Sequence, residues 1–194
     1  MKKLITILTF TLFSDQLYSQ KTEFVDLIFE KKDDLEFIQA VDSKIHSNFY
    51  LLSQTSPWLA DRFKLRSNSK GYYDTSELYF FSDSTIANIS SDMEKRNLAE
   101  QANILVSRAL TNTYKTIKIV DTLNKPNNSY VYQITDPIYT SDSAFAFIDA
   151  AVYYPNETDK FFNEAYEAQV MFIFRRSQNS GWILFNKKVK MMLW

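Results

Sequence analysis

The last third of the chain constrains the fold most, because it is built from segments rich in valine, isoleucine, phenylalanine and tyrosine. Branched and aromatic side chains favour strands. The turn from Lys125 to Ser129, in which a proline precedes two asparagines, separates these segments from the rest of the chain. The predicted strands are Tyr130 to Thr135, Ala144 to Tyr154, Glu167 to Arg176 and Trp182 to Trp194.

The last two segments should form an antiparallel hairpin, because Asn179, Ser180 and Gly181 make a tight connection between them. The final segment also has a period of two, which is typical of a strand with one buried and one solvated face. Its apolar positions Ile183, Phe185, Val189, Met191 and Leu193 alternate with Lys188 and Lys190. We therefore expect the C-terminal strand to belong to the core.

The part of the chain before Lys125 predicts helices. Asp33 and Glu36 have the spacing of a capping box, which starts a helix. A stripe of apolar residues follows at helical spacing, namely Leu35, Ile38, Val41, Ile45, Phe49 and Leu52. Residues 53–75 read as an ordered loop, because they contain Pro57, Gly71 and many serines.

A second helical region is expected to begin near Ser84. Its buried side would be Ile86, Ile89 and Met93, and it would resume through Leu98, Ala102 and Leu105.

Helices followed by strands predict an α+β domain, with N-terminal helices packed on a C-terminal antiparallel meander sheet. A cone-shaped, cystatin/NTF2-like sheet is one form of this class. We expect residues 20–194 to form one domain, with a helical half over 20–124 and a strand-rich half over 130–194.

The first nineteen residues have the order of a secretory signal peptide. Lys2 and Lys3 precede the apolar run from Leu4 to Phe13, and a short polar segment follows. The run of about ten residues is half of what a membrane span needs, so a stable anchor is not expected. We predict cleavage between Ser19 and Gln20 and a protein that is periplasmic or secreted.

Composition excludes several classes of function. The 22 basic and 23 acidic residues nearly balance, which favours neither nucleic acid nor an anionic membrane as a partner. The absence of cysteine excludes disulfides and thiol catalysis, and the presence of only two glycines excludes a glycine-rich phosphate loop. The single histidine, His46, cannot supply a site that needs two imidazoles, and we interpret it as structural. No cofactor or metal is predicted.

The C-terminal half also resembles a group of uncharacterised exported proteins from Bacteroidetes-type bacteria. The resemblance lies in "TDPIYTSDSAFA", in the hairpin that ends in Gly181 and Trp182, and in the last strand closed by Trp194. The upstream "FSDSTIANISSDM" is similar to a short helix of the same group. The resemblance implies export and a fold, and it implies no activity.

Three tripeptides resemble the Asp-Ser/Thr-apolar sequon used for O-glycosylation in such bacteria. They would place a glycan on Ser84, Thr122 or Ser143. Each tripeptide is equally compatible with simple capping of a turn or an element start.

Asp149 is the main candidate for a ligand-binding residue, because it interrupts the apolar face Phe145, Phe147, Ala151 and Tyr153. A buried carboxylate needs a partner. In a regular hairpin Lys187 would lie on the same face near Met171, and Arg175 is the other candidate partner. The alternative is an ion pair at a sheet edge, or a face exposed to water.

The sequence therefore predicts an exported, non-enzymatic binding or structural module that contacts a protein or a small-molecule ligand through its sheet face or its long loop. No catalytic residue is assigned. The alternative is a small hydrolase or isomerase with a cone-shaped α+β pocket, in which Asp149 would act as acid or base.

Overall fold

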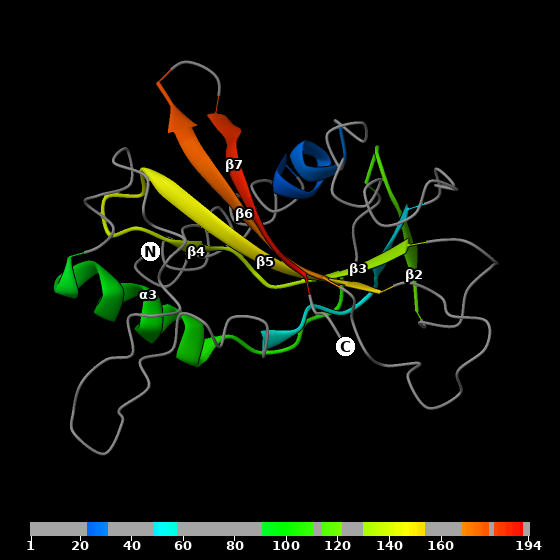
Figure 1. The fold of residues 1–194 in the computed structure, drawn as a ribbon, viewed down its shortest axis with the longest axis horizontal. Coiled ribbons are helices and arrows are strands. Elements are labelled where there is room, and N and C mark those ends of the chain that lie inside the picture. Colours follow the sequence, from blue (N-terminus) through cyan, green and yellow to red (C-terminus); the bar gives the residue numbers. More distant parts are fainter. Residues whose placement is uncertain are drawn as a thin grey trace, which may run out of the picture.

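One mixed seven-stranded sheet dominates the computed structural model of the chain (Figure 1). The structure describes residues 23–30, 49–57, 91–110, 114–121, 130–153, 168–178 and 181–191. The named elements are β1 (Phe49–Leu52), α3 (Asp92–Ile104), β2 (Lys118–Val120), β3 (Tyr130–Ile134), β4 (Ile138–Tyr139), β5 (Phe145–Tyr153), β6 (Ala168–Ser177) and β7 (Gly181–Met191). Residues 23–30 form a further helix.

Within the described residues, β3, β5, β6 and β7 confirm the four strands that the sequence predicts, whereas residues 154, 167 and 192–194 of those predictions lie outside the described residues. The sheet has the order β2-β1-β3-β5-β6-β7, and β4 pairs with β5 beside this path. Strands β3, β5, β6 and β7 are antiparallel to their neighbours in this series. The β6–β7 hairpin closes between Ser177 and Gly181, as expected.

The predicted fold class is wrong, because the sheet is not a purely C-terminal antiparallel meander. Strands β1 and β2 come from the half that was expected to be helical, and β1 is parallel to both β2 and β3. Phe49 and Leu52, assigned above to a helical stripe, are the ends of β1. A short apolar run fits a buried strand as well as a helix, and here the pairing with two distant strands decides. Asp33, Glu36 and His46 lie outside the described residues.

Helix α3 corresponds to the later part of the second predicted helical region. Ser91 is its N-cap and accepts a hydrogen bond from the Glu94 N–H at 3.2 Å. Leu98 and Ala102 are buried, as expected, but Met93 is 73 % exposed. The expectation for Met93 is wrong because Met93 is five positions before Leu98, which places its side chain about 140° away around a helix. Ser84, Ile86 and Ile89 lie outside the described residues.

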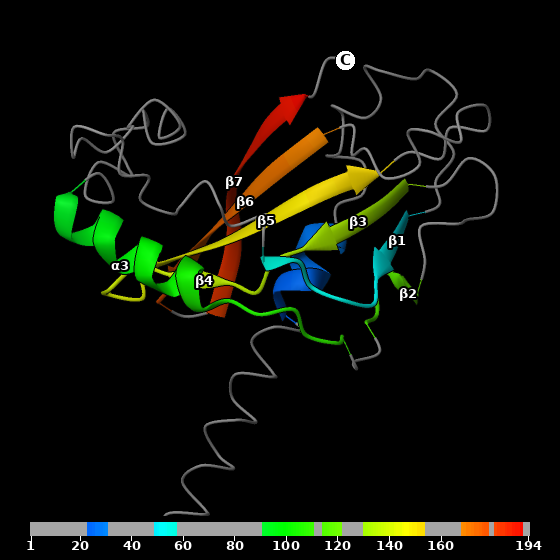
Figure 2. The same cartoon turned by 90° about the horizontal axis from the view of Figure 1, so that it is seen from below.

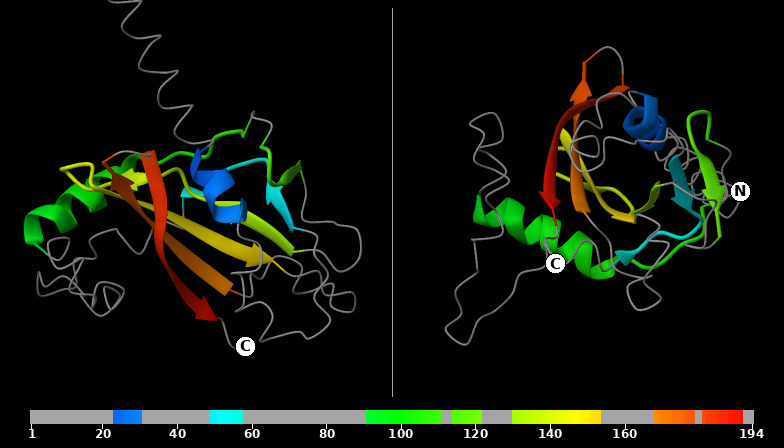
Figure 3. Two further views of the ribbon diagram at one scale, coloured as in Figure 1. Left: turned by 90° about the horizontal axis from the view of Figure 1, so that it is seen from above. Right: turned by 45° about the vertical axis from the view of Figure 1, so that its right-hand side comes forward.

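The sheet carries an apolar cluster on each face. The 23–30 helix lies beside the sheet on the face that we call the inner face (Figure 2). Its Phe24, Val25, Ile28 and Phe29 form one apolar cluster with alternate β5 residues such as Ile148. On the outer face, Leu98 and Ala102 of α3 pack against Phe147, Met171 and Ile173. The twisted sheet curves around the 23–30 helix (Figure 3). Because both faces are covered, nearly every β5 residue is buried.

Side-chain amides attach α3 to the free edge of β4. The Tyr139 N–H donates to Gln101 Oε1 at 2.9 Å, and Gln101 Nε2 donates back to the Tyr139 carbonyl at 2.6 Å. Gln101 thus makes the two backbone hydrogen bonds that a neighbouring strand would make with Tyr139. Two turns earlier, the buried Glu94 carboxylate accepts hydrogen bonds from the Ser141 N–H at 2.9 Å and the Ser141 hydroxyl at 2.5 Å. These contacts fix α3 on the outer face.

The start of the loop predicted over residues 53–75 is ordered against the segment that follows α3. The Thr55 N–H donates to the Arg108 carbonyl at 2.9 Å, and the Leu110 N–H donates to the Ser53 carbonyl at 2.6 Å. The remainder of that predicted loop, from residue 58 onward, lies outside the described residues.

Buried tyrosines should make the fold sensitive to alkali. Burial, with the negative charges of Asp26 and Asp136 adding to it, raises the pKa of Tyr114 to about 12. Burial and Asp136 likewise raise the pKa of Tyr139 to about 12, and burial raises the pKa of Tyr132 as well.

An unfolded tyrosine loses its proton near pH 10. Between about pH 10 and about pH 12 the unfolded chain therefore loses these protons while the folded chain keeps them. The free energy of unfolding falls progressively over this range of pH. Urea unfolding at about pH 9 and about pH 11 should show a fall in the free energy of unfolding. The fall should be smaller in Tyr114→Phe, and an equal fall in this variant would contradict the assignment.

Candidate functional site

Asp149 lies in the middle of β5 and is 1 % exposed. In the sheet it is opposite Met171 of β6. Gln169 Nε2 donates to Asp149 Oδ2 at 3.4 Å. The backbone of Asp149 bonds to Thr135, which donates its N–H to the Asp149 carbonyl at 2.8 Å and accepts the Asp149 N–H on its hydroxyl at 3.0 Å. Thr135 therefore holds the backbone of Asp149, and Gln169 holds its carboxylate within the sheet.

Lys187 does not share the face of Asp149, contrary to the register that a regular hairpin predicts. Lys188 is opposite Met171, and Lys187 is opposite Phe172 on the inner face. The cause is a β-bulge, because the register shifts by one residue between Ile173 and Phe174 of β6. A shift of one residue moves every later side chain of the strand to the other face.

The extra residue of the bulge is Phe185, since β6 pairs Phe174 with Leu184 and Ile173 with Asn186. The Asn186 side chain accepts the Lys187 N–H at 2.8 Å, so the backbone donor next to the bulge is satisfied. Phe185 packs on the outer cluster, and its ring lies 6.0 Å from that of Phe145 at 70°. Bulges commonly re-aim a side chain near a functional site.

Arg175 lies on the outer face and is exposed, opposite Phe145 in the sheet. Its guanidinium carbon is 4.9 Å from the centre of the Phe185 ring, which is the geometry of a cation–π contact. Four positions of β5 separate Phe145 from Asp149, or about 13 Å along a strand. The structure therefore does not bring Asp149, Arg175 and Lys187 together, and Arg175 interacts with an aromatic pair instead.

This aromatic pair was missed because it depends on the bulge. A signal for it was nevertheless present. Trp182 and Leu184, at even positions, belong to the inner cluster, whereas Val189 and Met191, at odd positions, take inner-face register positions opposite Val170 and Ala168. Such a switch from even to odd inward-facing positions within one strand indicates an inserted residue. Lys187 marks the place in the sequence, because it is a charged residue at an odd position where the predicted alternation requires an apolar one.

Ser143 lies in the turn between β4 and β5 and has a φ of 55°. Asp142 orders this turn by accepting hydrogen bonds from the Thr140 hydroxyl at 2.6 Å and the Ala144 N–H at 2.9 Å. The Thr140 hydroxyl, followed by the Ala144 N–H, lowers the pKa of Asp142. Ser19, Gln20, Ser84 and Thr122 lie outside the described residues, so processing and glycosylation remain predictions.

Other kinds of site find no support in the described part of the chain. No group of three histidine or acidic side chains there has the arrangement of a metal site. None of the helices described is long and apolar enough to span a membrane. Comparisons with family models, with curated proteins and with solved structures gave no match.

Proposed function

We propose that the protein is an exported, non-enzymatic binding module that contacts its partner through Arg175, Phe185 and Phe145. We call these three residues the bulge surface. The observation that carries the proposal is the position of Phe185, which the bulge places under the exposed Arg175 and beside Phe145. Arginine and aromatic residues are the types that most often dominate binding energy at protein interfaces.

The rigidity of the bulge surface favours binding. All three residues lie on long strands in the sheet, and the Phe185 ring packs against both Phe145 and the Arg175 guanidinium. A side chain that is already held in place loses less conformational entropy when a partner arrives. A catalytic role for Asp149 has weaker support, because a general acid or base must reach the substrate and this side chain is 1 % exposed.

Photocrosslinking in the producing cells tests the binding surface. The photoreactive amino acid p-benzoylphenylalanine would be placed at Ile183, which is opposite Arg175 in the sheet. The matched control carries it at Lys118, an exposed residue of β2 at the other edge of the sheet. We expect an adduct of defined mass from position 183 only, and loss of that adduct when Arg175→Ala is added.

Two outcomes would overturn the proposed surface. One is the absence of an adduct at position 183, and the other is an equal adduct at position 118. The same mass spectra test export, because a cleaved protein should yield no peptide from residues 1–13 and a new N-terminus near Gln20. Recovery of intact protein from the cytosol would contradict export.

A further inference from the structure

Positive charge is concentrated in the β6–β7 hairpin. Residues 168–191 contain five of the chain's 22 basic residues and none of its 23 acidic residues. The five are Arg175, Arg176, Lys187, Lys188 and Lys190. Because the whole chain has a net charge of −1, the remainder of the chain is clearly acidic. A local excess of one sign attracts partners of the other sign.

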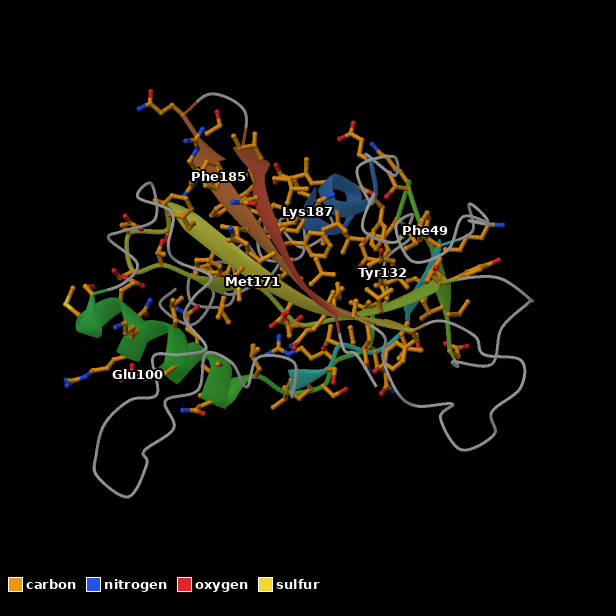
Figure 4. The ribbon with its side chains drawn as sticks, viewed as in Figure 1. Phe49, Glu100, Tyr132, Met171, Phe185 and Lys187 are labelled. Atoms are coloured by element: carbon orange, nitrogen blue, oxygen red, sulfur yellow. The ribbon has the colours of Figure 1, made fainter. Side chains whose placement is uncertain are left out.

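Two of the described basic residues lie on the same face as the bulge surface. Arg175 and Arg176 are exposed, and Lys187 and Lys188 are partly exposed. Arg175 and Lys188 take register positions on the outer face, whereas Arg176, opposite Trp182, and Lys187, opposite Phe172, take positions on the inner face. Figure 4 shows Phe185 near the hairpin end of β7 and Lys187 farther along the same strand. A partner that covers the bulge surface therefore meets the positive charges of Arg175 and Lys188.

Strand addition at β7 is the mode of binding that the structure opposes. β7 is the edge strand of the sheet, but two of its backbone donors are already bonded to side chains. The Trp182 N–H donates to Glu23 Oε1 at 3.0 Å, and the Lys187 N–H donates to Asn186. Bulges and edge lysines are devices that keep a sheet edge from pairing with another chain. Contact through side chains is thus favoured.

The contact between Arg175 and Phe185 indicates which chemical groups of a partner can bind at the bulge surface. The Arg175 guanidinium lies over one face of the Phe185 ring, so this face of the ring is not free to stack on a sugar. The guanidinium still offers N–H donors, and its fork matches the two oxygens of a carboxylate. Phe145 and Phe185 supply apolar surface beside it. This combination fits aspartate or glutamate next to an apolar residue.

We propose that the β6–β7 hairpin binds an acidic segment of a partner protein through Arg175 and Lys188, an inference that rests on the proposed function. Carboxylates of the segment pair with the basic side chains, and an apolar residue of the segment contacts the bulge surface. The interaction should weaken as salt is added, because exposed charges are screened within about 10 Å at moderate ionic strength.

Binding of the full chain to poly-L-glutamate at low ionic strength tests the inference. Arg175→Gln combined with Lys188→Gln should raise the dissociation constant roughly three- to tenfold. The matched control, Arg96→Gln with Lys118→Gln, removes the same charge from exposed positions on α3 and β2 and should leave the constant within about twofold of the parent value. Thermal unfolding of both variants reports whether the fold is intact.

Several results would overturn the acidic-segment proposal. They are an equal loss in the control, tighter binding of dextran sulfate or phosphatidylserine vesicles than of poly-L-glutamate, and self-association of the chain that the Arg175 and Lys188 changes abolish. An adduct at Ile183 with a partner segment that carries no carboxylates would refute this inference and leave the proposed function standing. The lack of any adduct there would refute the proposed function itself.

Discussion

Replacing Phe24 with alanine is expected to lower the free energy of unfolding by about 3–5 kcal/mol. Phe24 is completely buried at the start of the 23–30 helix. Its ring lies 4.7 Å from that of Phe174 and 5.1 Å from that of Trp182, so it joins the helix to β6 and β7. Removal of the ring leaves a cavity where these elements meet, and urea denaturation measures the loss.

A second variant on the same helix separates packing from helix formation. Glu30 is exposed, so Glu30→Ala removes a side chain without opening the core, and its effect should stay within about 0.5 kcal/mol. Equal stability of the Phe24→Ala and Glu30→Ala variants would show that the helix does not pack on the inner face. A selective loss in Phe24→Ala would support the arrangement of the inner cluster.

Replacing Gly181 with alanine should destabilise the protein by about 2–4 kcal/mol. Gly181 has a φ of +78°, a conformation that costs other residues about 1–3 kcal/mol. An added Cβ would also lie 2.6 Å from Glu23 Oε1. The flexible carboxylate can move away, but it then loses the Trp182 N–H, a hydrogen bond worth about 1–1.5 kcal/mol.

A double-mutant cycle separates the two causes. In a Glu23→Ala background the carboxylate is absent, so Gly181→Ala should cost only the backbone strain. The coupling between the two substitutions should then be about 1 kcal/mol in equilibrium unfolding. Strict additivity would show that Glu23 does not cap β7. A neutral Gly181→Ala variant would contradict the left-handed turn.

Much of the strand-rich half was predictable because its signals are local. Aromatic and β-branched residues mark β3, β5, β6 and β7, and the glycine after Asn179 and Ser180 marks the hairpin. The burial of Leu98 and Ala102 was also predictable from helical spacing. In each case neighbouring residues contain the information, so no distant partner is needed to interpret it.

The candidate site was predictable only in part. Asp149 was identified because it interrupts an apolar face, and the sequence left open whether it is buried or lies at an edge or a solvated face; the structure buries it. Its expected partners are wrong in position, because one inserted residue exchanges Lys187 for Lys188 on that face. Arg175 was identified for its charge, but its contact with Phe185 became visible only in the structure.

The sequence by itself determined the C-terminal strands and their hairpin, because side-chain shape and turn residues act over a few positions. The tertiary structure decided that Phe49–Leu52 is a strand, since these four residues gain their backbone partners from β2 and β3, far along the chain. It also decided the bulge at Phe185. Trp182 and Leu184 pack on the inner cluster, and Val189 and Met191 lie opposite the inner-face residues Val170 and Ala168. An even and an odd set of positions can face the same cluster only if one residue is inserted between them, and that choice depends on residues that the strand meets only after folding.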